Sequence, residues 1–175
     1  MPTRSHTLVV QVEDHPGVLN RVMSLFRQRG FNVDSVAVGH AEAPGISRMT
    51  FVISGDDKIV EQVTKQLYKL LEVIKVNDVT GENTIQRELA LIKVNANDRT
   101  RADIMRIATD IFRARFVDAS PDSLTLEVTG PSDKIESLLT MIRPYGIKEV
   151  ARTGLVAMTR GGGTGTLSIV RDAVA

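Results

Sequence analysis

The chain has 175 residues, of which 42% are hydrophobic and 25% charged, a composition typical of one globular domain or two small ones. A net charge of +1 and an aromatic content of 4%, with no tryptophan, argue against a basic, base-stacking surface for nucleic acid. The absence of cysteine excludes disulfides, thiolate metal sites and cysteine nucleophiles. No apolar run approaches the roughly 20 residues of a membrane helix, and residues 1–6 lack the apolar core of a signal peptide, so we expect a cytoplasmic protein.

The first half of the chain predicts elements in the order β-α-β-β-α-β. Residues alternate in a strand pattern from Leu8, then follow a helical spacing from about Gly17 to Gly30, a glycine placed to end the helix. Asp56 and Asp57 stand at the start of a second helical pattern, where the helix dipole favours acidic residues. The predicted elements lie at residues 8–12, 17–30, 31–38, 46–54, 55–70 and 73–79, with a hairpin loop at 40–45.

The second half repeats the same order of elements after about 75 residues. Strands are predicted at 88–94, 116–119, 124–129 and 147–156. Thr100 is placed to cap the first helix of this half, and Pro131 opens the second helix, which Pro144 ends. The apolar residues predicted to share one side of the first helix are Ile104, Ile107, Ala108, Ile111 and Phe112.

Two consecutive βαββαβ units predict an α+β fold of two tandem ferredoxin-like modules, each a four-stranded antiparallel sheet with two helices on one face. Polar, turn-rich residues 80–84 separate the modules, so the predicted domains are 1–80 and 81–160, followed by a flexible tail at 161–175. A module of this size leaves one face of its sheet bare. We therefore expect the chain to form at least a dimer.

The turn between the first strand and the first helix is the strongest candidate for a ligand site. Asp14 or His15 is placed to cap the helix, and Pro16 suits its first turn. Gly17 lets another molecule approach the backbone, and the N–H groups of Gly17, Val18 and Leu19 then offer a seat for a carboxylate or phosphate. The alternative is an ordinary capped turn with no ligand. The equivalent turn of the second half, residues 95–100, has no glycine at the helix start.

No residue pattern supports catalysis. The three histidines, His6, His15 and His40, have no spacing typical of metal ligands, and no nucleophile elbow is present. The carboxylate clusters at 56–57 and at 118 and 122 are explained by helix capping and turns. The sequence therefore predicts neither catalytic nor metal-binding residues, and it favours a binding or regulatory module.

Several motifs resemble one known family. Asp14-x-Pro16-Gly17-Val18-Leu19, at the first strand–helix turn of a βαββαβ unit, resembles the ACT domain, a small-molecule sensing module that often binds amino acids. The run at 26–35, with the sequence FRQRGFNVDS, is similar to the acetohydroxyacid (acetolactate) synthase small subunit. Further similar runs occur in the same order along the chain, at residues 47–50, 65–70, 87–94 and 149–154.

The resemblance implies a regulatory subunit of acetolactate synthase that is not itself an enzyme. Such a subunit binds the catalytic large subunit, raises its activity and makes it sensitive to feedback by valine, sometimes leucine or isoleucine, in branched-chain amino-acid biosynthesis. Thiamine diphosphate, a divalent metal such as magnesium and FAD are then expected in the large subunit, and no cofactor in this chain. The resemblance also implies a homodimer through the ACT domain, with the effector between two ACT modules.

Carried onto this chain, the resemblance implies that the turn of one protomer meets the strand around Asn32 of the other. The amide of Asn32 would bond a charged end of the effector, and Leu19, Val33 and Val36 would line a small apolar pocket. His15 stands where many members carry glutamate, which changes the charge near the effector ammonium. The implied effector-binding residues are Asp14, His15, Pro16, Gly17, Val18, Leu19, Asn32, Val33 and Val36.

Two other functions compete with this one. A free-standing ACT-type sensor would regulate another enzyme or transcription, but no helix-turn-helix or basic face is visible. A small ferredoxin-like enzyme would need a catalytic cluster, which the sequence does not contain.

Overall fold

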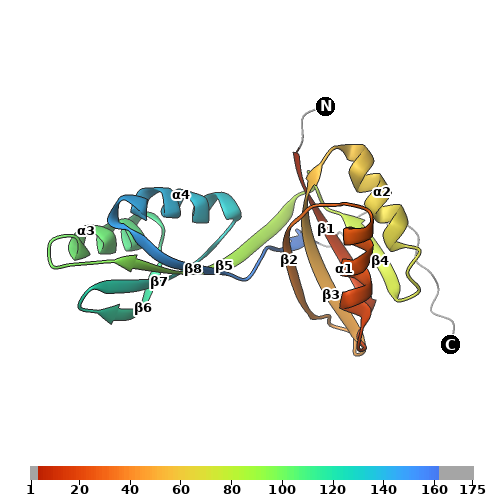
Figure 1. The fold of residues 1–175 in the computed structure, drawn as a ribbon, viewed down its shortest axis with the longest axis horizontal. Helices are drawn as coiled ribbons and strands as arrows, with labels where there is room; N and C mark the ends of the chain where they lie inside the picture. Colours follow the sequence, from red (N-terminus) through yellow and green to blue (C-terminus); the bar gives the residue numbers. More distant parts are fainter. Residues whose placement is uncertain (1–3, 162–175) are drawn as a thin grey trace. The chain divides into compact units, whose positions relative to one another are not determined.

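The structure is a computed structural model that describes residues 4–161, and its chain forms two compact units (Figure 1). The first unit holds residues up to Ile85 together with the segment that begins at Leu155, and the second unit holds Gln86–Gly154. The elements of the first unit follow the predicted order, and they are β1 Arg4–Glu13, α1 Val18–Gln28, β2 Val33–His40, β3 Ile46–Gly55, α2 Asp57–Leu67 and β4 Val73–Asp78.

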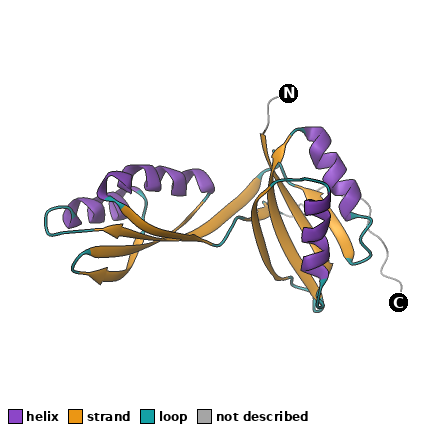
Figure 2. Cartoon of the chain, viewed as in Figure 1, coloured by secondary structure: helices purple, strands orange, loops and turns teal. Residues whose placement is uncertain are grey.

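The first sheet has the strand order β2-β3-β1-β4, antiparallel throughout, and α1 and α2 cover one of its faces (Figure 2). Alternation along β1 sends Leu8, Val10 and Val12 to the helix side, where all three are fully buried. Beneath the helices, the rings of Phe26 and Phe51 stack with centroids 4.9 Å apart. The hydrophobic core of this unit therefore lies between the sheet and its two helices.

The ends of α1 and α2 follow from local sequence signals. Gly30 adopts φ +67° just after α1, and the N–H groups of Gly30 and Phe31 donate to the carbonyls of Arg27 and Phe26. These two hydrogen bonds are typical of a helix C-terminus that ends at a left-handed glycine, as the sequence predicts at this position. At the start of α2, the Asp56 carboxylate accepts a hydrogen bond of 3.0 Å from the backbone N–H of Ile59.

The second unit repeats the order of elements. They are β5 Thr84–Asn95, α3 Arg101–Arg106, the π-helical turn η1 Ile107–Ile111, β6 Arg115–Ser120, β7 Ser123–Gly130, α4 Ser132–Ile142, the 3₁₀ turn η2 Arg143–Tyr145 and β8 Ile147–Arg152. The strand order is β6-β7-β5-β8, and the helices cover one face of the sheet. The predicted fold of two tandem ferredoxin-like modules is thus confirmed.

Two expectations for α3 are wrong. Thr100 makes no side-chain cap bond; instead the Asn97 side chain accepts from the N–H groups of Arg99 and Thr100, both at 3.0 Å. The helical spacing predicts Ile111 on the apolar side, but its side chain is 59% exposed. The physical reason is the π-helical turn at Ile107–Ile111, because an extra residue in a turn shifts the following side chains around the helix axis.

The predicted last strand at 147–156 is in fact interrupted. β8 ends at Arg152, and a separate strand, β9 Val156–Thr159, belongs to the first unit and pairs with β5. Ala157 of β9 packs with Val9 and Val79 on the sheet face opposite the helices of the first unit. The face of the first sheet that the sequence predicts to be bare is therefore partly covered, and residues 155–160 lie with the first unit rather than with the predicted second domain. The predicted tail, apart from Gly161, lies outside the described residues.

Within residues 4–161, no helix is long and apolar enough to cross a membrane.

Candidate functional site

The turn between β1 and α1 is shaped by one glycine. Gly17 adopts φ +91° and ψ −13°, a left-handed conformation that non-glycine residues avoid, and it forms the N-cap of α1 without any side-chain cap bond. The next residue, Val18, is buried in the core, with 3% of its surface exposed. The turn is thus anchored from beneath by Val18, while Asp14, His15, Pro16, Gly17 and Leu19 remain exposed.

Backbone N–H groups at this helix start are open to a ligand. Among the described residues, the N–H groups of Gly17, Leu19 and Asn20 have no backbone or side-chain acceptor. The N–H of Val18 faces the carbonyl of His15 at 3.4 Å, a long contact that leaves it only weakly engaged. The predicted set of three amides therefore changes, because Val18 is partly occupied and Asn20, which the sequence pattern does not single out, is free.

The acidic and histidine side chains of the turn do not cap the helix, contrary to expectation. The Asp14 carboxylate instead lies 2.9 Å from Nδ1 of His40, at the end of β2. His15 Nε2 lies 3.1 Å from the Glu13 carboxylate. The turn is also held through its backbone, because the N–H of Asp14 donates to the carbonyl of Gly45 at 2.8 Å. These side chains fix the turn to neighbouring elements and leave the helix start unobstructed.

Arg21 adds a positive charge beside the turn. Its Nη2 lies 3.9 Å from the place that a Cβ at Gly17 would occupy, and its Nε lies 2.8 Å from the Glu72 carboxylate. Glu72 is mostly buried and holds the guanidinium against the first turn of α1. A carboxylate bound at the open amides would lie close to this arginine. The sequence signal that was missed is the spacing of four residues from Gly17 to Arg21, which places both on one face of a helix start.

The second group of predicted residues lies where β2 begins. Asn32 is exposed just before the strand, and its Nδ2 donates a 2.7 Å hydrogen bond to Asp34. The register of β2 on β3 shifts between Val33 and Ser35, so Asp34 sits at a bulge, where its other carboxylate oxygen accepts a hydrogen bond from Ser54. The bulge residue Asp34 therefore holds the exposed amide of Asn32, which lies directly before the edge strand β2.

Val33 and Val36 are partly buried and pack against the core beneath the helices. Leu19 is 44% exposed on α1. Within one chain, the predicted residues therefore fall into two groups, the turn at 14–19 and the start of β2. The first group offers backbone N–H groups without acceptors among the described residues, and the second offers an amide at a sheet edge.

The equivalent turn of the second unit is partly capped by the side chain of Asn97. Asn97 Oδ1 accepts from the N–H groups of Arg99 and Thr100, and the carbonyl of Asn97 accepts from Arg101 at 2.9 Å. The N–H groups of Thr100 and Arg101 are thus bonded, whereas the N–H groups of Ala102 and Asp103 have no acceptor among the described residues, as is the case for Leu19 and Asn20 in the first unit. The two helix starts therefore differ at the N-cap, where Gly17 has a free N–H and no side chain, while the N–H of Thr100 is bonded to Asn97.

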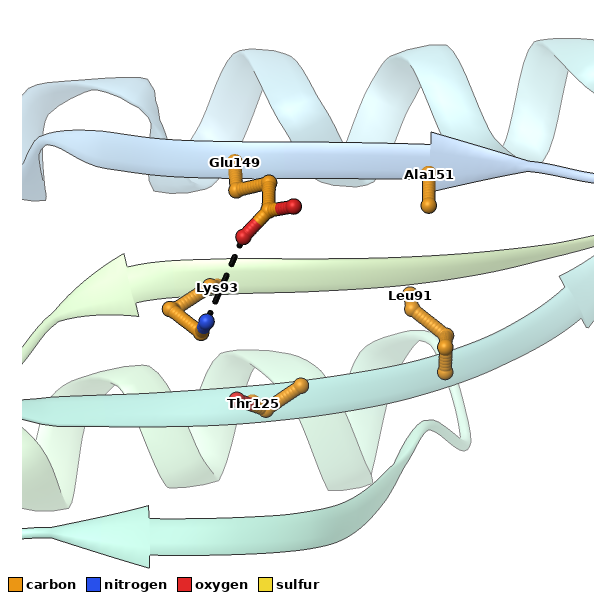
Figure 3. Close-up of a pocket in the computed structure, with 5 residues that line it drawn as sticks. All are labelled: Leu91, Lys93, Thr125, Glu149 and Ala151. Atoms are coloured by element: carbon orange, nitrogen blue, oxygen red, sulfur yellow. Dashed lines mark hydrogen bonds and ion pairs between the residues drawn. The ribbon is translucent and has the colours of Figure 1, made fainter.

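A shallow hollow of about 220 Å³ lies on the sheet of the second unit, on the face away from the helices (Figure 3). It is lined by Leu91, Lys93, Thr125, Glu149 and Ala151. Lys93 and Glu149 are cross-strand partners in register, and their side chains form an ion pair of 3.2 Å. The hollow is smaller than typical ligand sites of roughly 300–1,000 Å³, and its charged groups already satisfy each other, so it is the weaker candidate.

The described residues contain no group of three or more histidines or carboxylates arranged to hold a metal ion. The most buried carboxylate of the second unit, Glu88, is bound by the Arg152 guanidinium, with Nε donating at 3.1 Å. Hydrogen bonds to Glu88 raise the pKa of Arg152 above its ordinary value, and the bond to Glu136 adds to this effect. This cluster joins β5, β8 and α4 and has the character of a structural ion pair.

Comparison with known proteins gives a consistent result for both units. A family model described as the small subunit of acetolactate synthase matches residues 87–161, and one described as the AHAS small subunit-like ACT domain matches residues 8–75. The chain is 56% identical over 156 residues to the probable acetolactate synthase small subunit of Archaeoglobus fulgidus, a match that covers 89% of this chain and 97% of that protein. It is 53% identical to the acetolactate synthase small subunit of Mycolicibacterium smegmatis, covering 91% of this chain and 93% of the other.

The crystal structure of the acetolactate synthase small subunit from Thermotoga maritima superposes with a TM-score of 0.83 at 41% sequence identity. That match covers 91% of this chain and 99% of the other. The similarity to known proteins thus extends over both units.

Proposed function

This chain belongs to the acetolactate synthase small-subunit family, and we propose that it activates a catalytic large subunit and makes that activity sensitive to a branched-chain amino acid. The family and the ACT domain make the chain a regulatory subunit with a large-subunit partner. The proposal adds the direction of the effect and the class of effector.

The observation that carries the proposal is the open start of α1. N–H groups of Gly17, Leu19 and Asn20 without acceptors in the described chain, at the positive end of an eleven-residue helix, suit a carboxylate. Arg21 lies beside them and adds a favourable charge. An amino acid supplies such a carboxylate, and the exposed Leu19 offers an apolar contact for its side chain.

The ammonium end of the effector needs a second surface. We propose that two chains pair through their ACT domains, so that the start of β2 in one protomer faces the turn of the other. Asn32 then presents its amide oxygen to the ammonium, since its Nδ2 is already bound to Asp34. The edge position of β2 in the first sheet is compatible with such pairing.

The large subunit, in this proposal, carries the reaction and its thiamine diphosphate, magnesium and FAD. The present chain contributes no reacting group. Effector binding at the ACT pair favours one arrangement of the two chains, and the large subunit responds to that arrangement.

The test is reconstitution with the large subunit of the same organism. Acetolactate formation is measured for the large subunit alone, with this chain, and with this chain plus valine, leucine or isoleucine. We expect higher activity with the chain and inhibition by at least one of the three amino acids. Calorimetric titration and sedimentation of the free chain then give the effector affinity and the oligomeric state. An unchanged activity would overturn the activating role, and absence of both inhibition and heat would overturn the effector.

A further inference from the structure

Residues 155–160, here called the return segment, run across the first unit after the chain has left the second. Leu155 and Ala157 are 5% and 4% exposed, so the segment is packed rather than loosely attached. The carbonyl of Ala157 accepts a 2.8 Å hydrogen bond from Nη2 of Arg48 on β3. The N–H of Arg160 donates to the carbonyl of Asn83 at 2.9 Å. The segment is therefore held in its middle and at its last residue by specific bonds.

A third attachment joins the return segment to β2, the strand that begins next to Asn32. The backbone N–H of Leu155 donates a 3.1 Å hydrogen bond to Oγ of Ser35. Ser35 directly follows the β2 bulge at Asp34, the residue that orients the amide of Asn32. One side of the bulge is thus held by Asp34, through its bond from Ser54, and the following residue is held by the return segment.

We propose that Ser35 is a positioning residue for the effector site, through which the return segment holds the start of β2 and couples effector binding to the second unit. A bulged strand start has one residue more than its partner strand and so has a choice of register. The bond from Leu155 selects the register in which Asn32 faces outward. An effector that requires this register also tightens the bond to Leu155, because coupling between two sites is reciprocal.

The backbone connects the return segment to β8 of the second unit through a short link. Leu155 follows the end of β8 by only two intervening residues, Thr153 and Gly154. Thr153 is itself held, since its N–H donates to the carbonyl of Leu89 at 3.1 Å. A change in how firmly Leu155 is bound is therefore passed along a short, anchored stretch of backbone to the strand β8.

The test uses the full chain and a matched pair of substitutions in β9. Ala157→Glu places a charge in the contact with Val9 and Val79, whereas Met158→Glu places the same charge at a side chain that is 62% exposed. Only Ala157→Glu is expected to detach the return segment. Its effect is measured by hydrogen exchange at the Leu155 amide and by valine titration of the free chain.

Ser35 is tested in the same way with two substitutions. Ser35→Ala removes the acceptor of the Leu155 amide and is expected to speed its exchange and weaken valine binding, each by roughly threefold to tenfold. Ser35→Thr keeps a hydroxyl and is expected to restore both values, which a purely steric role of the position would not do. In the unmodified chain, valine is expected to slow exchange at Leu155.

The outcomes separate this inference from the proposed function on which it rests. If the unmodified chain binds none of the three amino acids, the effector part of the proposed function fails and the coupling fails with it, while exchange at Leu155 still decides whether Ser35 holds the segment. If valine binds the unmodified chain and Ser35→Ala or Ala157→Glu with equal affinity, the coupling is refuted and the proposed function stands.

Discussion

Replacing Gly17 with alanine tests the helix start as an anion seat. The substitution adds only a methyl group, and the nearest atom to the new Cβ is Nη2 of Arg21 at 3.9 Å, so no steric clash results. The difficulty is the backbone, because φ at this position is +91° and alanine disfavours the left-handed region. The expected effect is thus on the shape of the turn rather than on packing.

The left-handed conformation costs a non-glycine residue about 1–2 kcal/mol. For a domain of this size, each kcal/mol lowers the midpoint of thermal unfolding by about 4–8 °C. We therefore expect Gly17→Ala to lower the midpoint of the first unit by roughly 4–16 °C. A turn that relaxes to relieve this strain reorients the N–H of Gly17. The loss of one hydrogen bond to a carboxylate, about 1.5–3 kcal/mol, then weakens effector binding about tenfold or more.

Gly30, at the other end of α1, provides the matched control. It has φ +67° and no atom within 4 Å of the place that a Cβ would occupy, so Gly30→Ala carries a similar backbone cost without touching the helix start. Thermal unfolding should therefore report comparable losses for the two variants. Calorimetric titration with valine should separate them, with weaker binding in Gly17→Ala and unchanged binding in Gly30→Ala. Equal valine affinity in the two variants, whether reduced or retained, would refute the anion seat at Gly17.

Three further predictions concern single side chains. Asn32→Ala removes an exposed amide and is expected to change the free energy of unfolding by less than about 0.5 kcal/mol, while valine binding in calorimetry weakens about tenfold. Arg152→Met leaves the buried Glu88 carboxylate unpaired and is expected to destabilise the second unit by about 3 kcal/mol in urea unfolding, the lower end for a buried pair because the arginine is 31% exposed. Lys148→Met removes the hydrogen bond, and then the charge, that hold the pKa of Asp122 below its ordinary value, so the pKa of Asp122 should rise when followed by NMR titration.

For each of these three predictions, one result would contradict the reasoning. Lys93→Met breaks the exposed pair with Glu149 and should cost less than about 1 kcal/mol, so a loss as large as that of Arg152→Met would contradict the importance of burial. Undiminished valine binding in Asn32→Ala would remove this residue from the effector site. If the pKa of Asp122 stays low in Lys148→Met, its lowering comes from the backbone hydrogen bond to Asp122 rather than from Lys148.

Much of this architecture is readable from local patterns. The period-two alternation around Leu8 and the helical spacing after Gly17 mark a strand and a helix, since each pattern matches the geometry of one element. Gly30 ends α1 as predicted, because a left-handed helix end favours a residue without a Cβ. The position of the turn at Gly17 is also predictable, as it needs only a glycine at the junction of two recognisable elements, whereas the side-chain cap expected from Asp14 or His15 is absent.

Other features depend on contacts between distant parts of the chain. The sequence predicts Asp14 as a helix cap, but in the fold its carboxylate lies against His40 instead. The interruption of the predicted last strand could not be foreseen, because the pattern does not reveal that Ala157 meets Val9 and Val79. Ser35 likewise acquires its partner Leu155 only when the chain returns to the first sheet.

Sequence alone is thus sufficient for the two βαββαβ units and for the glycine turn before the first helix, because each arises from interactions within a few neighbouring residues. Folding was needed to choose the partner of each polar side chain and to place the return segment over the first sheet. These choices are made by burial and hydrogen-bond geometry across more than a hundred residues of chain between Ser35 and Leu155, a separation over which local periodicity carries no information.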